Sequence, residues 1–92
     1  MAMIKLLEYT FDNTIDTDCL PTFTDVGTIE VIDSVSGNIT TRIINVEETG
    51  LPTKISFTSK TALTELLYAN TDNVNNMHDI FSRCTNLKYV NL

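Results

Sequence analysis

Few side chains in this sequence could carry out acid–base or nucleophilic chemistry. His78 is the single histidine among 92 residues, and Asp79 and Ser82 follow it closely. A catalytic dyad or triad needs a nucleophile and an orienting acid that converge on the imidazole. It also needs enough surrounding chain to exclude water, which a chain of this length does not supply around His78. We therefore expect no enzyme activity and no catalytic residue.

Acidic and amide side chains gather in one early loop, where their oxygens would suit a hard cation such as calcium. The residues are Asp12, Asn13, Asp16 and Asp18. The glycine and the terminal bidentate glutamate of a calcium-binding hand are both missing from this loop. The prediction is a solvated turn, with no bound metal and no cofactor.

The two cysteines, Cys19 and Cys84, stand far apart and belong to no C-x-x-C or cysteine–histidine spacing. That spacing argues against zinc and redox chemistry. A disulfide between them in an oxidising compartment and two buried free thiols are both compatible with the sequence. We favour the free thiols, and we expect Cys84 to serve packing rather than nucleophilic chemistry.

The charge balance excludes several classes of partner. Six basic and twelve acidic residues give a formal charge of -6, which repels nucleic-acid phosphates and anionic lipid headgroups. The basic residues form no stripe along the sequence: Lys5, Arg42, Lys54, Lys60, Arg83 and Lys88. No apolar run is long enough to cross a bilayer, and the first residues lack the pattern of a secretory signal. We expect neither nucleic-acid binding nor membrane insertion.

The elements that must position these side chains are mostly strands. Alternating or β-branched residues predict strands over 3–11, 28–35, 39–47 and 54–58, with a short apolar segment around Cys19 and Phe23. Between the second and third of these strands, Gly37 and Asn38 tolerate the positive φ of a tight hairpin turn. In this hairpin we expect one packed and one solvated face, with Arg42 pointing away from Ile43. Five strands by residue 58 indicate a small antiparallel β-sheet or sandwich domain.

Beyond residue 58 the chain repeats itself at a separation of 24 residues. Residues 57–63, FTSKTAL, align with residues 81–87, FSRCTNL, and Leu66 then aligns with Val90. This period falls within the range of leucine-rich repeats, in which each unit supplies a short strand and a returning turn or helix. Val74, Met77, Phe81 and Cys84 recur at intervals of three and four residues, which predicts a short helix with one apolar face.

Residues 70–92 carry a more specific pattern, with positions Asn73, Val74, Asn76, Met77, Phe81, Cys84, Leu87, Val90 and Leu92. The segment resembles the unit of BspA-like leucine-rich repeats, roughly D-T-S-N-V-T-N-M-x-x-M-F-x-x-C-x-x-L-x-x-L-x-L. Three departures are clear: Ile80 replaces the usual methionine, Thr71-Asp72 inverts the usual order, and the sequence stops after one full unit. The resemblance covers about a quarter of the chain.

The resemblance implies a division of the chain and a set of core positions. Residues 1–58 would form an N-terminal antiparallel β cap, and 59–92 the first repeat, with further repeats after Leu92. The expected fold is thus mainly β, a sheet or sandwich followed by a leucine-rich-repeat-like strand and short-helix unit. His78 would be largely exposed. The expected repeat core comprises Val74, Met77, Phe81, Cys84, Leu87 and Val90.

The function that the resemblance implies is binding without catalysis. We expect the N-terminal cap of an adhesin or host-recognition protein, on a bacterial cell surface or a phage virion. Its partner would be a protein or glycan on a cell surface, or copies of itself, with Tyr68 and Tyr89 as contact candidates. The alternative is a structural virion or surface-assembly domain that oligomerises through a β edge.

Overall fold

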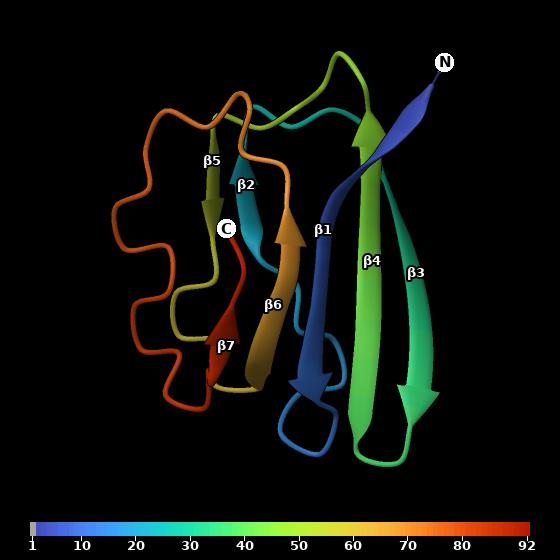
Figure 1. The fold of residues 1–92 in the computed structure, drawn as a ribbon, viewed down its shortest axis with the longest axis vertical. Coiled ribbons are helices and arrows are strands. Elements are labelled where there is room, and N and C mark those ends of the chain that lie inside the picture. Colours follow the sequence, from blue (N-terminus) through green and yellow to red (C-terminus); the bar gives the residue numbers. More distant parts are fainter. Residues whose placement is uncertain (1) are drawn as a thin grey trace.

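A computed structural model describes residues 2–92, and its main element is a five-stranded sheet (Figure 1). The strand order is β3–β4–β1–β6–β7, and all neighbours are antiparallel except β6 and β7. The bounds are β1 (Met3–Asp12), β3 (Ile29–Ser36), β4 (Ile39–Glu47), β6 (Leu63–Ala69) and β7 (Tyr89–Val90). The prediction of a mainly β fold is confirmed.

An irregularity in the central strand β1 explains why apolar and polar residues alternate imperfectly in its sequence. The pairing of β1 with β4 shifts between Lys5 and Leu7, which is a β-bulge. Such a bulge places an extra residue in one strand and changes the direction of the following side chains. Leu6 and Leu7 are therefore both fully buried, as are Tyr9 and Phe11 further along the strand.

A smaller layer completes the core. The short strands β2 (Thr22–Thr24) and β5 (Lys54–Ser56) pair antiparallel as a separate two-stranded sheet. Cys19, Ile55 and Phe57 from this part of the chain are buried in the same cluster as the side chains of the large sheet. The ring of Phe57 meets that of Tyr9 edge to face, with centroids 5.1 Å apart. Five strands lie within the first 58 residues, as expected, but in two sheets.

The predicted hairpin is present as β3 and β4. Ser36 pairs with Ile39 across the turn, and Gly37 takes a φ of 59°. Asn38 does not share this positive φ, so the turn has the type II′ geometry, with glycine at its first central position. The residues of β4 alternate between buried and partly exposed along the strand, whereas nearly all of β3 is exposed.

The prediction of a short helix at the C-terminal end is wrong: no helix occurs within residues 2–92. Residues 70–88 instead form successive turns, each closed by single bonds such as Ser82 N–H to the Asp79 carbonyl. Asp79 and Arg83 have positive φ values of 58° and 63°, which an α-helix cannot continue through. In Figure 1 these turns follow one another at the margin farthest from β3.

The C-terminal turns lie against the part of the chain that precedes them by one repeat. Phe57 N–H donates to the Ile80 carbonyl and Ser59 N–H to the Ser82 carbonyl, both at 2.7 Å. Strand β7 pairs in parallel with β6, Glu65 with Tyr89 and Leu66 with Val90. The residues that align in sequence therefore lie side by side in space.

One hydrophobic cluster extends through both predicted domains. Ala62, Leu63 and Leu66 are buried together with Tyr9 and Phe11, and β6 pairs directly with β1. The boundary between residues 58 and 59 stays a prediction. Strand β6, which follows this boundary, belongs to the same sheet as β1, the central strand.

Candidate functional site

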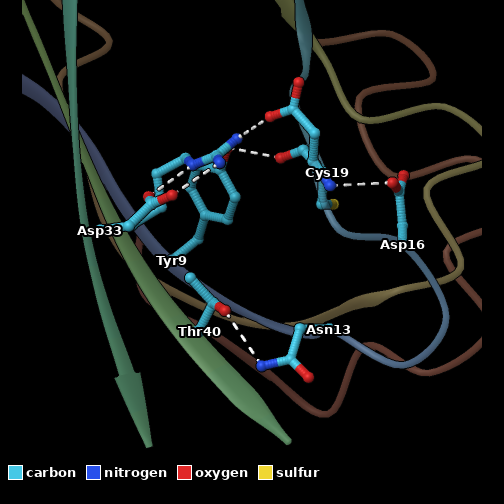
Figure 2. A network of polar contacts seen from close by, with 8 residues as sticks. Tyr9, Asn13, Asp16, Cys19, Asp33 and Thr40 are labelled. Carbon is cyan, nitrogen blue, oxygen red and sulfur yellow. Dashed lines mark hydrogen bonds and ion pairs between the residues drawn. The ribbon is translucent and has the colours of Figure 1, made fainter.

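A network of polar side chains surrounds Arg42 on β4. Figure 2 shows this network and labels Asp33, which lies opposite Arg42 on β3. Its guanidinium donates from Nε to Asp33 Oδ1 at 2.7 Å and from Nη2 to Asp33 Oδ2 at 2.8 Å. Nη1 donates to Asp18 Oδ1 at 2.5 Å. The same group lies over the ring of Phe11, 5.1 Å from its centroid.

The prediction of Arg42 on the solvated face is wrong, because Arg42 is buried on the same face as Ile44 and Val46. A buried charge is tolerated only when paired and hydrogen-bonded. Asp33 supplies a bidentate partner from the opposite position on β3, and Asp18 a second partner from the loop before β2. Arg42 thus fastens that loop to the sheet.

Electrostatics stabilise this arrangement in its charged form. The hydrogen bonds from Arg42 lower the pKa of Asp33, and the hydrogen bond to Asp33 raises the pKa of Arg42 further above its ordinary value. Tyr9 Oη donates to the Cys19 carbonyl at 2.6 Å, and burial raises the pKa of this phenol. Throughout residues 2–92 every buried side-chain nitrogen or oxygen has a hydrogen-bond partner. The polar groups around Arg42 therefore bond to one another and form a structural network.

The carboxylates of the oxygen-rich loop accept hydrogen bonds from the backbone of the loop itself and from Arg42 on the sheet. Asp12 Oδ1 accepts bonds from the N–H and the hydroxyl of Thr14, which lower the pKa of Asp12. Asp16 Oδ1 accepts from the N–H of Asp18. Asn13 Nδ2 donates to Thr40 Oγ1 (Figure 2). Within the described chain no three potential metal ligands cluster together.

The remaining reactive side chains do not meet. The side chain of His78 is 82% exposed, and its Nε2 lies 3.2 Å from Oδ2 of Asp79. Both cysteines are free: Cys19 is buried, and Cys84 is half-buried with its Sγ donating to the Phe57 carbonyl. Burial raises the pKa of Cys19 to about 11 and also raises that of Cys84. Both thiols are therefore held in their unreactive neutral form.

The expected repeat core is only partly buried. Val74, Phe81, Cys84 and Leu87 pack against the core cluster while remaining half-buried. Met77 and Val90 are exposed in the described chain, so their place in a core shared with further repeats stays a prediction. The fully enclosed residue of this segment is Ile80, whose carbonyl bonds to Phe57 N–H. The three- and four-residue spacing predicted a helix, whereas this segment forms turns. For this reason the spacing did not identify Ile80 as the enclosed residue.

The first exposed surface, here named the C-terminal edge, is formed by Tyr89 and Val90 of β7 together with Leu92. Tyr89 is 51% and Leu92 64% exposed. Tyr68 on β6 and Tyr89 on β7 are both exposed as contact candidates should be, although Lys5 lies over the Tyr68 ring. Strand β7 is the last strand of the sheet, so one of its sides has no neighbouring strand.

The second exposed surface, here named the β3 edge, lies at the opposite end of the sheet (Figure 1). Val31, Ile32, Val35 and Ile39 are all exposed, Val35 by 66%. The strand contains no lysine, no proline and no bulge, three features that commonly protect an edge from pairing. Its two charged residues, Glu30 and Asp33, both bond to side chains of β4. The alternating sequence predicts the strand, but not its place at the end of the sheet with a neighbour on one side only.

No pocket is present in the part of the molecule that the structure describes. The same part contains no helix long and apolar enough to span a membrane. Comparisons of the chain with known proteins match no family model, no curated protein and no solved structure.

Proposed function

We propose that the protein is a non-catalytic binding module, the N-terminal cap of a leucine-rich-repeat adhesin or host-recognition protein. The observation that supports this proposal is the parallel pairing of β7 with β6 between residues one repeat apart. Parallel stacking of successive similar units is how solenoid proteins bury a continuous core.

Further contacts join residues that lie 24 or 25 positions apart. Asn91 Nδ2 donates to the Leu67 carbonyl, 24 residues earlier, and Asn91 N–H donates to the Leu66 carbonyl. The rings of Phe57 and Phe81 are stacked with centroids 6.1 Å apart. Each contact joins a donor or ring of the later unit to the corresponding place in the earlier one. A third unit could repeat this set of contacts on the C-terminal edge.

The partner in this proposal is a protein or glycan of a bacterial cell surface, and the setting is that surface or a phage virion. Tyr68 and Tyr89 are the contact candidates, because amphipathic aromatic side chains supply contact area at low entropic cost.

The test is to append a second copy of residues 69–92 directly after Leu92 and to measure urea unfolding. If the C-terminal edge accepts a unit of its own kind, the midpoint rises and the slope increases, since more surface is buried in one transition. A chain that carries the same added residues in shuffled order is the matched control. Equal midpoints for the two extended chains, with the true copy cleaved readily by protease, would overturn the repeat proposal.

A second candidate function is a structural assembly domain that oligomerises through a β edge. The observation that favours it is the β3 edge, a strand of eight residues with exposed valine and isoleucine side chains and no lysine, proline or bulge. Sedimentation equilibrium separates the two candidates, because the assembly domain associates on its own and the solenoid cap needs only further repeats.

A further inference from the structure

The β3 edge has the features of a strand prepared for pairing. Strand β3 has eight residues and a neighbouring strand, β4, on one side only. Strand β7, at the other end of the sheet, is only two residues long. Val31 and Val35 lie opposite Ile44 and Thr40, and therefore on the core face of the sheet, yet both are exposed. An additional strand beside β3 would extend the sheet and shield both valines.

The hairpin turn determines which backbone groups of β3 are free. Ser36 and Ile39 flank a two-residue turn and pair with each other, and such a flanking pair exchanges both backbone hydrogen bonds. Bonded and non-bonded pairs then alternate along the strands. The even-numbered residues from Glu30 to Ser36 therefore bond to β4, and the odd-numbered residues from Ile29 to Val35 direct their N–H and C=O groups outward.

The charges of the strand argue against a basic peptide as the neighbour. Asp33 is already held by both Nε and Nη2 of Arg42, and Glu30 accepts a hydrogen bond from Asn45. These acidic side chains have partners within the hairpin. The remaining residues of the strand are isoleucine, valine and serine, which suit a neighbour of the same composition.

The strand is complementary to itself in one register. Two copies related by a two-fold axis normal to the sheet pair residues of equal parity. With the axis at Ile32, that residue meets its own copy, Ile29 meets Val35, and Glu30 meets Ser34. Val31 meets Asp33, whose carboxylate is already held by Arg42. With the axis at Asp33, two carboxylates would face each other, which is destabilising. With the axis at Val31, Glu30 would lie against Ile32 and Asp33 against Ile29.

We propose that β3 pairs antiparallel with β3 of a second copy of this chain, about a two-fold axis at Ile32, to form one continuous sheet across the dimer. This inference deepens the assembly function proposed above and rests on it. The outward groups of Val31 and Asp33 exchange hydrogen bonds across the axis, and Ile32 meets its counterpart at a non-hydrogen-bonded position.

Sedimentation equilibrium from micromolar to millimolar protein tests the association. The wild-type chain is expected to reach twice its mass of 10.3 kDa. Ile32→Lys places two like charges at the axis and should weaken dimerisation by about tenfold or more. Tyr89→Lys, on the C-terminal edge, is the matched control and should leave the dimer intact. A wild-type monomer throughout, or a dimer that Tyr89→Lys dissociates and Ile32→Lys does not, would overturn the proposal.

Cross-linking tests the register. In a Cys84→Ser background, Ile32→Cys should form an intermolecular disulfide on mild oxidation, because the two thiols face each other at the axis. Ser34→Cys should not, since residue 34 faces residue 30 of the other copy. Cross-linking of Ser34→Cys without Ile32→Cys would show that the axis lies elsewhere. The appended-repeat experiment tests the C-terminal edge, at the other end of the sheet, and measures urea unfolding instead of association. The repeat proposal and the dimer proposal can therefore fail independently.

Discussion

Arg42 shows at the scale of one residue what the sequence can and cannot reveal. Counting back from the turn pair Ser36 and Ile39 places Asp33 opposite Arg42, so this ion pair could have been found from the hairpin register. Asp18 could not, because its position depends on how the loop between β1 and β2 folds over the sheet. Without these partners in view, an arginine in an alternating strand is assigned to the solvated face.

The ion pair predicts a dependence of stability on acid. Hydrogen bonds from Arg42 lower the pKa of Asp33 in the folded state, so the unfolded chain binds a proton more readily than the folded one. The stabilisation is present above the unfolded pKa of about 4 and is lost as the pH falls through the lowered value. The urea midpoint should therefore fall between about pH 5 and pH 2.

Asp33→Asn should lower the midpoint at neutral pH, because it leaves the buried Arg42 with one partner fewer. It should also flatten the acid dependence. Asp72→Asn, in the exposed turn after β6, serves as the control. If Asp33→Asn and the wild type lose stability in parallel as the pH falls, the pair with Arg42 contributes nothing measurable.

The thiols make a second prediction at this scale. Burial raises the pKa of Cys19 to about 11, and only the thiolate reacts with alkylating reagents. In a Cys84→Ser variant, Cys19 should react with iodoacetamide at neutral pH only as fast as the protein unfolds. Urea should then accelerate labelling in step with the unfolded fraction. Rapid labelling without urea would show that Cys19 is accessible in the native state.

Strands were predictable at the scale of the element and the C-terminal turns were not. The β-branched alternation of β3 and β4 reflects a period of two that the sheet itself imposes. The spacing of apolar residues after residue 70 is compatible with a helix and with turns stacked on an earlier unit. The bonds from Phe57 and Ser59 to the carbonyls of Ile80 and Ser82 favour the turns, and local spacing contains no trace of them.

Two glycines join the start of β3 to the end of β4. Gly27 N–H donates to the Gly50 carbonyl at 2.9 Å, and a Cβ added to Gly50 would lie 2.7 Å from the Gly27 Cα. Because backbone cannot move aside as a flexible side chain can, Gly50→Ala should destabilise the protein by about 1–3 kcal/mol in urea unfolding. Thr49→Ala, next to it and exposed, should change little. Equal effects would show that the close approach is not required.

The whole molecule depends on contacts between residues far apart in the sequence. The sequence correctly indicates a mainly β protein, and it predicts a boundary after residue 58 without showing which residues meet across it. In the structure β1 lies between β4 and β6, and Phe57 contacts both Tyr9 of β1 and Phe81 of the C-terminal turns. Hydrophobic patterning shows which residues are buried but not which distant residues they contact.

This arrangement predicts the behaviour of a chain that ends at residue 58. Such a chain lacks Leu63 and Leu66, which are fully buried, and leaves one side of β1 without a neighbour. Each leucine contributes about 1.5–3 kcal/mol by burial, against a total stability of about 5–15 kcal/mol for a small domain. Residues 1–58 should therefore show no cooperative thermal transition, whereas residues 1–92 should show one. A folded 1–58 chain with dispersed amide resonances would establish an independent cap and make β6 an addition to a sheet that is already stable.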